Sequence, residues 1–359
     1  MNSRKTALSF AAAGTAAGVI GLVVLATPAG AGEAPPALPP VAAEALVESV
    51  LNTDHIPALA GTVTVDNNLG LPIPGMPKSS GDDGGIKVWA DGTGKGRLAI
   101  SDRQSETTVV DDGTTVWVWD SRERSVTKVP HAGGMADKPL EGKLADPATA
   151  AAELITAMQQ DSTVTVDGTA RVAGRPVYQL VLTPKPSERT LLREIRVSVD
   201  SDLRIPLQLE VLANGQADPA VKVGFTEFSA APQDAELFTF TPPAGATISE
   251  ENIEEKTHGK NIDDVLAQAD VKTVGRGWDI VATGRIPADA LAAAEGMTGR
   301  DGGDALAMLE TFGKKVTGEF GTGYAISTSV GTALITEDGK VAVGAVPVQV
   351  VTEAIATVK

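Results

Sequence analysis

The sequence predicts a mostly β protein of the α+β class, with one antiparallel sheet followed by a smaller α+β domain. Between residues 59 and 228, short stretches rich in β-branched residues alternate with turn signals at a spacing of roughly 10 residues, which is typical of neighbouring antiparallel strands. With one exception these strands do not alternate with helices, as the strands of a parallel sheet do. Further segments with helical spacing begin near residue 41 and return beyond residue 250.

The composition narrows the range of functions. Of 359 residues, 42% are apolar but only 4% are aromatic, so the core must be built mainly from Val, Leu, Ile and Ala. A net charge of −16 argues against a nucleic-acid partner, because phosphate binding needs a basic surface. The absence of cysteine excludes disulfides, thiolate metal sites, a cysteine nucleophile and a lipidated N-terminal cysteine.

Residues 1–31 have the pattern of a signal peptide. Arg4 and Lys5 supply positive charge, residues 7–26 are uncharged and rich in Ala, Gly, Val and Leu, and residues 29–31 (AGA) match a cleavage site. Residues 7–26 are also long enough to stay in the bilayer as an N-terminal membrane anchor. Both alternatives predict an exported chain, either secreted or held at the extracytoplasmic face of the cell membrane.

The first domain is predicted over residues 41–249, after a Pro/Ala-rich linker at residues 32–40 that should stay extended. Apolar residues at helical spacing predict an amphipathic helix over residues 41–52. A second helix, capped by Asp146, is predicted over residues 148–159. The strands before and after it are expected at residues 59–66, 85–90, 96–101, 107–110, 115–120, 125–129, 162–166, 176–183, 194–199, 206–212 and 221–228.

The second domain is predicted over residues 250–359. Pro242-Pro243 and the acidic stretch at residues 250–255 mark the boundary between the two domains. Beyond it the patterns predict helices at residues 262–269, 288–295 and 304–312, a strand at 272–284, a hairpin at 331–346 turned at Asp338-Gly339, and a closing helix at 347–357.

No constellation in the sequence predicts catalysis. The three histidines, His55, His131 and His258, lie in predicted loops, and none has a second histidine at the spacing of a metal site. The chain lacks a G-x-S-x-G elbow, a phosphate-binding loop and a dinucleotide fingerprint. Acidic pairs such as Asp82-Asp83 fall in turns, although carboxylates distant in sequence stay open as a pair. We therefore expect no enzyme, no cofactor and no metal.

Two features are candidate binding elements. The loop at residues 67–80 carries apolar side chains between three prolines, and is either a lid that meets lipid or protein or a loop that folds back on its own core. Its apolar residues are Leu69, Leu71, Ile73 and Met76. Trp117-Val118-Trp119 is apolar on both faces of one strand, so the sheet there is either covered on both sides or lines a cavity with one face.

Three phrases in the first domain resemble a known superfamily. They are the hairpin at residues 109–119 (VVDDGTTVWVW), the strand pair at residues 197–207 (VSVDSDLRIPL) and the closing run at residues 238–246 (FTFTPPAGA). In this order, over residues 41–248, they resemble the superfamily of the bacterial lipoprotein carrier LolA and the envelope-stress regulator RseB, and look closest to its actinobacterial members. The resemblance implies a strongly curved antiparallel half-barrel with helices in its mouth, and a hydrophobic cavity for lipoprotein acyl chains or related lipids.

Alternation within the strands places residues on shared faces, without showing which face is concave. Combined with the fold that the resemblance implies, it gives an expected set of cavity-lining residues. They are Val63, Val65, Ile86, Val88, Leu98, Ile100, Trp117, Trp119, Leu180, Leu182, Val197, Leu207 and Leu209.

The sequence therefore predicts an extracytoplasmic, non-catalytic binding protein for lipid, lipoprotein acyl chains or another hydrophobic ligand, acting as carrier or sensor. The second domain keeps an alternative open, because LolA-type carriers usually end after one domain and a two-domain layout is more similar to RseB. On that alternative the chain is a regulatory module in envelope-stress signalling. Its partner would be a membrane protein, such as a transporter or an anti-sigma-type regulator.

Overall fold

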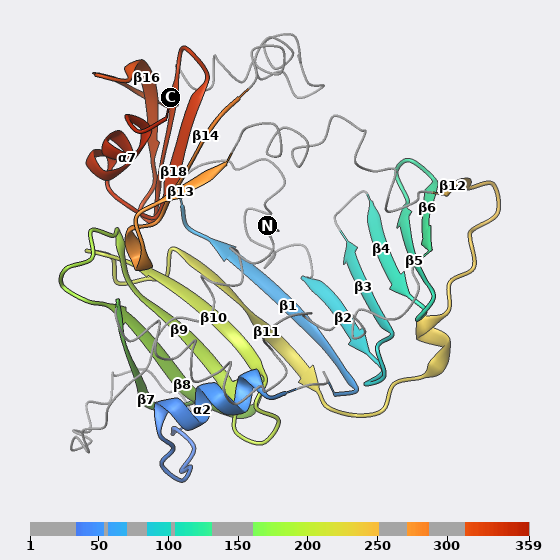
Figure 1. The fold of residues 1–359 in the computed structure, drawn as a ribbon. Coiled ribbons are helices and arrows are strands. Elements are labelled where there is room, and N and C mark those ends of the chain that lie inside the picture. The colour runs from blue at the N-terminus through green and yellow to red at the C-terminus, as the bar shows by residue number, and fades with distance from the viewer. Residues whose placement is uncertain are drawn as a thin grey trace.

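The structure, a computed structural model, describes residues 34–53, 57–69, 85–101, 105–130, 161–250, 271–286 and 313–358. These residues form a 12-stranded sheet, a 6-stranded sheet and two short α-helices, which confirms the prediction of a mostly β chain. Figure 1 shows the larger sheet as a wide arch with the smaller sheet at one end of it. The larger sheet is open, with β7 (Ser162–Val172) and β12 (Thr247–Glu250) at its two edges.

The larger sheet has the strand order β12-β6-β5-β4-β3-β2-β1-β11-β10-β9-β8-β7. Each strand predicted for the first domain overlaps one of these. The remaining bounds are β1 (Leu59–Asn67), β2 (Ile86–Ala90), β3 (Gly96–Ser101), β4 (Glu106–Asp111), β5 (Thr115–Asp120), β6 (Ser125–Pro130), β8 (Arg175–Pro184), β9 (Leu192–Asp200), β10 (Pro206–Ala213) and β11 (Val221–Ser229).

Two runs of antiparallel neighbours make up this sheet. Strands β1–β6 form one run and β7–β11 the other, and they join where β1 pairs with β11. A bulge interrupts that pairing between Thr62 and Val63. The expectation of a purely antiparallel sheet is wrong at one edge, where β12 pairs with β6 in parallel. The reason is the connection: residues 230–246 carry the chain from β11 to the far edge instead of turning back in a hairpin.

The register of the strands separates apolar from charged side chains. Directly opposed residues of neighbouring strands share a face of the sheet. We call "inner" the face that carries the row Val65, Val223, Leu209, Val197 and Leu180. The opposite, outer face carries the neighbouring row Asp66, Lys222, Glu210 and Arg196.

Helix α2 (Ala43–Leu51) covers the inner face of β7–β9. Its Leu46 is fully buried, in a core cluster that includes Tyr178, Leu180 and Leu182. Figure 1 shows α2 lying across these strands. The predicted amphipathic helix is confirmed, and its apolar positions turn toward the sheet.

The segment before α2 is attached to the sheet. The Thr169 hydroxyl donates a 2.7 Å hydrogen bond to the Pro36 carbonyl, and the Tyr178 hydroxyl donates a 2.9 Å hydrogen bond to the Pro39 carbonyl. Leu38 packs against the same core cluster as α2. The carbonyl is the only backbone group with which proline can make a hydrogen bond. The expected linker is therefore docked on β7 and β8 over its described part.

Part of the β11–β12 connection packs on the outer face of the larger sheet. It contains the 3-10 helix η1 (Ala235–Phe238), in which Phe238 is 2% exposed. Two residues further on, the ring of Phe240 lies 5.7 Å from the ring of Trp117. Apolar residues of the β11–β12 connection therefore cover part of the outer face of β3–β6.

The smaller sheet is antiparallel, with the order β13-β14-β18-β17-β16-β15. The hairpin turned at Asp338-Gly339 and the closing helix are confirmed. The bounds are β13 (Lys272–Val274), β14 (Val281–Arg285), β15 (Lys314–Gly318), β16 (Gly321–Ser327), β17 (Thr332–Thr336), β18 (Lys340–Gly344) and α7 (Val348–Ile355).

The single strand predicted at residues 272–284 is wrong. Gly275 and Gly277 have φ values of 87° and 55°, a left-handed conformation that breaks the strand into β13 and β14. The 3-10 helix η3 (Gly277–Asp279) lies between them. The hairpin of β15 and β16 was not among the predicted elements.

Trp278 in η3 joins the two sheets. Its side chain is 5% exposed and belongs to the same core cluster as Leu46. Its indole Nε1 donates a 2.8 Å hydrogen bond to the Ser162 hydroxyl at the start of β7, and its backbone N–H donates one of 3.0 Å to Glu188. The smaller sheet is thus anchored in the core of the larger one.

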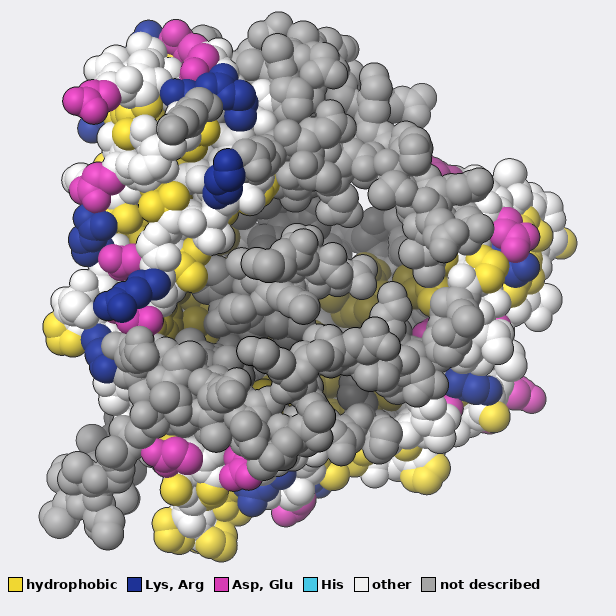
Figure 2. All heavy atoms as spheres, in the orientation of Figure 1, with side chains coloured by type: hydrophobic (Ala, Val, Ile, Leu, Met, Phe, Trp, Pro, Cys, Tyr) yellow, Lys and Arg dark blue, Asp and Glu magenta, His cyan; other side chains and the backbone are white. Residues whose placement is uncertain are grey.

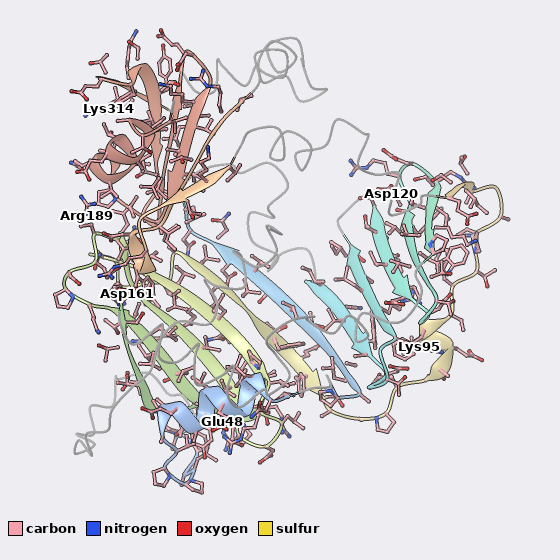
Figure 3. All side chains as sticks on the ribbon, viewed as in Figure 1. Glu48, Lys95, Asp120, Asp161, Arg189 and Lys314 are labelled. Carbon is pink, nitrogen blue, oxygen red and sulfur yellow. The ribbon has the colours of Figure 1, made fainter. Side chains whose placement is uncertain are left out.

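Charged groups surround this junction. Arg189, labelled in Figure 3, donates hydrogen bonds to Asp279 and to Glu353 of α7, the latter at 2.7 Å. Burial raises the pKa of the Glu188 carboxyl, and the nearby charges of Asp279 and Asp161 raise it further. Of these carboxylates, Asp279 is paired with Arg189, and Asp161 lies 3.8 Å from Arg276.

Several expectations concern residues outside the described ranges. They are the signal peptide or anchor at residues 1–31, the helices at residues 148–159, 262–269, 288–295 and 304–312, and the three histidines. Within the described ranges, no helix has the length and apolar character needed to cross a membrane.

Candidate hydrophobic ligand-binding face

The inner face of β1–β6 is apolar and only partly covered. Two rows of register partners define it, Val63–Ile86–Ile100 and Val88–Leu98–Val109–Val118. These side chains are half-buried, except for Ile100, which is 43% exposed. None of them belongs to the core clusters around Leu46, Leu207 or Leu334. Figure 2 shows hydrophobic side chains in the hollow of this side of the molecule.

Alternation in the sequence produces this face. In β2, Ile86 and Val88 point inward while Lys87 between them points outward, as the pairing with β1 and β3 requires. In β3, Leu98 points inward and Arg97 points outward. Because side chains alternate along a strand, each strand adds apolar groups to one side and polar or packed groups to the other.

The apolar face continues across the seam between β1 and β11. Val65 opposes Val223, and Val223 opposes Leu209. Leu209 packs against the core cluster around Leu46. The partly exposed inner face of β1–β6 and the packed inner face of β7–β10 are therefore continuous, with apolar residues at the seam between them.

Other expected cavity residues are part of the filled core. Leu180, Leu182 and Val197 share the inner face but are 7%, 3% and 9% exposed, since α2 and Trp278 pack over them. Leu207 is buried in a separate cluster with Val177. The structure thus places these β8–β9 side chains on the inner face, where other side chains cover them.

Trp117 and Trp119 lie on the outer face, opposite to Leu98 and Ile100. Trp117 opposes Val110, and Trp119 opposes Val126, both of which are fully buried. Phe240 lies beside Trp117. The expectation that the tryptophans line the same cavity as Leu98 and Ile100 does not agree with this register. The sheet is instead apolar on both sides here.

Four inner-face valines were missed by the sequence reasoning. Val118 stands between the two tryptophans and faces inward with Val109, while Val116 and Val129 form the next pair. The sequence prediction assigned the cavity to Trp117 and Trp119, which lie on the outer face of β5. Pairing Val109 with Val118 across the Asp112-Gly113 turn could have found them.

Of the expected lid residues, Leu69 alone lies in the described ranges. Its backbone N–H donates a 3.1 Å hydrogen bond to the side chain of Asn67, and it is half-buried. Leu71, Ile73 and Met76 lie outside the described residues.

The polar groups of β4 and β5 have structural roles. Burial raises the pKa of Asp112, but hydrogen bonds from the Trp117 indole, the Thr114 hydroxyl and the backbone N–H groups of Thr114 and Thr115 outweigh it and lower the pKa to about 2. Asp112 is therefore an ionised acceptor that holds the β4–β5 turn. Within the described part of the chain, no three His, Cys, Asp or Glu residues are grouped as a metal site.

A separate hollow of about 530 Å³ lies in the smaller sheet. It is bounded by β15, β16 and the start of α7, and Lys314, Val316, Ala325 and Val348 contribute to its wall. It shares no residue with the inner face of the larger sheet. The candidate ligand-binding face is thus a broad surface, distinct from this hollow.

The fold and this face define a class of protein with one open, curved sheet whose inner side offers an apolar surface. No protein-family model and no curated protein matches the sequence. Among solved structures, the chain is similar to the MucA/MucB complex structure of Pseudomonas aeruginosa, with 18% identity, a TM-score of 0.42, and coverage of 87% of this chain and 96% of that chain.

Two further solved structures cover little more than half of this chain. LprF from Mycobacterium bovis is 13% identical, with a TM-score of 0.28, and the match covers 57% of this chain and 97% of that chain. The LolA superfamily protein NE2245 from Nitrosomonas europaea is 11% identical, with a TM-score of 0.20 and coverage of 56% and 99%.

Proposed function

We propose that the chain is an extracytoplasmic, non-catalytic binding protein for a lipid or acyl chain, which lies along the inner face of β1–β6. The observation that supports this function most is the pair of apolar register rows, one of which contains the 43% exposed Ile100. Soluble proteins seldom leave a contiguous apolar surface open without a ligand or partner for it. Residues 41–249 would form the binding domain, and residues 250–359 a second domain.

The size of the face suits a single lipid. Covering the exposed part of one of these Val, Leu or Ile side chains contributes less than about 1 kcal/mol, because most of each side chain is already buried. The apolar contacts from Val63 on β1 to Val118 on β5 add up along a bound chain, against the entropy that is lost on association. The apolar continuity through Val65 and Val223 gives a chain further room toward the seam.

Native mass spectrometry tests this proposal directly. The protein is purified as exported by an expression host, and any bound molecule is extracted and identified. We expect about one lipid per chain, the stoichiometry of a single apolar site of this kind. Wild-type protein that carries no lipid and takes up no fluorescent fatty acid would contradict the proposal.

A matched pair of variants locates the site. Leu98→Asp places a carboxylate on the inner face and should reduce bound lipid at least tenfold, because an unpaired charge is costly to bury. Lys87→Asp changes the charge of the neighbouring strand on the outer face, where Lys87 is exposed, and should leave lipid binding unchanged. Equal loss in both variants would place the site elsewhere.

A second candidate function is regulatory binding of a membrane protein through the smaller sheet. Val343 is 53% exposed, and its register partners Ala333 and Ala282 lie on the same side of that sheet, opposite to the cluster under α7. A crosslinked membrane-protein partner that is lost in Val343→Asp would favour this function. A partner that still crosslinks to Val343→Asp would contradict binding through this face of the smaller sheet.

A further inference from the structure

The hollow of the smaller sheet reaches the outer edge of β15. Four consecutive residues of this strand, 314–317, contribute to its wall. Successive side chains of a strand point to opposite faces, so a hollow on one face alone would be lined by every second residue. The hollow therefore extends along the backbone edge of β15. Among the described strands, β15 is the last of its sheet and pairs with β16 only, which leaves its other edge toward the hollow.

Helix α7 forms the opposite wall of the hollow. The helix packs mainly on β14, β17 and β18, and its residues Val348, Gln349 and Thr352 face the hollow beside β15. Ala325 of β16 is 5% exposed in the core cluster beneath α7, and Val316 of β15 is half-buried against the same cluster. The hollow is therefore a groove between a strand edge and a helix, with an apolar floor.

Exposed lysines stand on both faces of this strand edge. Lys314 opposes Ala325 and so lies on the face that α7 covers, where Figure 3 labels it close to α7. Lys315 opposes Tyr324 on the other face, with its ammonium group 6.0 Å from the ring centre and 3.8 Å from Glu337. That ion pair is exposed, so water and other charges exchange with it easily. The described residues that line the hollow include no Asp or Glu.

We propose that the outer edge of β15 binds an extended, acidic segment of another protein, which adds to the smaller sheet as a further strand. Backbone N–H and C=O groups along residues 314–317 pair with this segment, as in β-strand addition to other sheet edges. An apolar side chain of the segment lies over Val316 and Ala325, and carboxylates on its two faces meet Lys314 and Lys315. This edge shares no residue with the inner face of the larger sheet, so its binding is independent of the proposed lipid binding.

A second copy of the chain fits this edge less well than an acidic partner. Two β15 edges paired with each other would bring Lys314 and Lys315 of both copies together, and like charges across a strand pair are destabilising. Lysines on an edge strand oppose self-association for this reason. The chain as a whole carries a net charge of −16, so the edge of β15 is a local positive site on an acidic protein.

Two labelled peptides test the proposal on the full chain. The acidic probe EEVTEEVT carries glutamate on both faces of an extended strand and valine on one, and the basic probe KKVTKKVT replaces each glutamate by lysine. Fluorescence anisotropy should show that the acidic probe binds about tenfold more tightly than the basic probe. Hydrogen exchange should slow at the amides of Lys314–Gly318 when the acidic probe is bound, and stay unchanged at β13, on the other edge of the sheet.

The two edge strands of the smaller sheet supply a matched pair of variants. Lys314→Glu reverses a charge on β15 and should weaken binding of the acidic probe by about tenfold. Lys272→Glu makes the same change on β13 and should leave the affinity as in the wild type. Both lysines are exposed, so both variants should fold, which a thermal melt checks. The exchange measurement uses the wild type and decides the question even where a variant unfolds.

Four results would overturn the proposal, and none of them bears on lipid binding. Equal affinity for the two probes, or binding of neither, would show that the edge of β15 does not select an acidic segment. Equal weakening in Lys314→Glu and Lys272→Glu would reduce the effect to net charge. Binding without slower exchange at β15 would place the probe elsewhere. A dimer of the chain that itself protects the β15 amides would assign this edge to a second copy.

Discussion

The indole of Trp278 and the hydroxyl of Ser162 form a buried hydrogen bond of 2.8 Å between the two sheets. Trp278 is 5% exposed and Ser162 is 3% exposed. Because neither group can turn to water, loss of one leaves the other without a partner. This pair therefore combines packing and polar contributions at a single point of the junction.

Substitution of Trp278 should separate these two contributions. Trp278→Ala removes a buried aromatic side chain and should lower the free energy of unfolding by about 3–5 kcal/mol. Trp278→Phe keeps part of the packing and should cost about 1–3 kcal/mol, mainly through the unsatisfied Ser162 hydroxyl. Chemical denaturation measures both values.

A double-mutant cycle with Ser162→Ala completes this test. Ser162→Ala should cost about 1 kcal/mol in the wild type and little in the Trp278→Phe background, because the hydrogen bond is already gone. An equal cost in both backgrounds would show that the Trp278–Ser162 bond contributes nothing to stability.

Gly277 should be intolerant of a side chain. A Cβ atom there would lie 2.5 Å from the Cβ of Asp161. Gly174 also has a left-handed φ, 77°, but a Cβ atom there has no neighbour within 4 Å. Gly174→Ala should therefore cost about 1 kcal/mol from the backbone conformation alone. Gly277→Ala should cost about 1–3 kcal/mol more through steric overlap, and equal costs for the two variants would contradict the close packing at the junction.

Acid should weaken the β4–β5 turn through Asp112. The pKa of Asp112 is lowered to about 2 in the folded chain, below the usual value of 3.8. A carboxylate with a lowered pKa stabilises the fold above its unfolded pKa, and this stabilisation is lost as the pH falls toward the folded value. The shift corresponds to about 2 kcal/mol.

Urea denaturation of the wild type and Asp112→Asn from pH 6 to pH 2 measures this contribution. The wild type should be more stable than Asp112→Asn at pH 6, and the difference should shrink between pH 4 and pH 2 as Asp112 becomes protonated. A difference that stays constant over this range would assign the stabilisation to something other than the charge of Asp112.

The Arg175–Asp200 pair should be sensitive to loss of the cation. Asp200 is fully buried and accepts hydrogen bonds from Arg175 at 2.7 and 2.9 Å. Arg175→Met leaves that carboxylate without its cation and should cost about 3–5 kcal/mol. Lys315→Met at an exposed ion pair, 3.8 Å from Glu337, should cost less than about 1 kcal/mol. Similar unfolding midpoints for the two variants would contradict the importance of the buried pair.

The strands of the larger sheet were predictable because their signals are local. Alternation and turn residues depend on neighbours in sequence, and every strand predicted for the first domain overlaps an observed strand. The inner face over β1–β3 followed from the same alternation. The smaller sheet was less predictable, since glycines interrupt β13–β14 and β15–β16.

Features that depend on distant residues were not predictable. The apolar cover over Trp117 comes from Phe240, which reaches it from the β11–β12 connection. The burial of Leu180 and Val197 depends on α2 and on Trp278, which lie far from both residues in the sequence. The parallel pairing of β12 rests on four residues, too few for a periodic signal. Tertiary contacts therefore decide which part of the apolar face stays open.

The seam between β1 and β11 has a consequence for the order of folding. The hairpins within β1–β6 and within β8–β10 close short loops, but Thr62 and Glu227, which are hydrogen-bonded at the seam, are 165 residues apart. Contacts this distant form slowly, because the entropy of closing a long loop is lost before they stabilise the chain. We therefore expect the pairing of β1 with β11 to form late in folding. Refolding kinetics of variants at Thr62 would measure this step. A nascent chain would join the two halves of the larger sheet only once synthesis has passed β11.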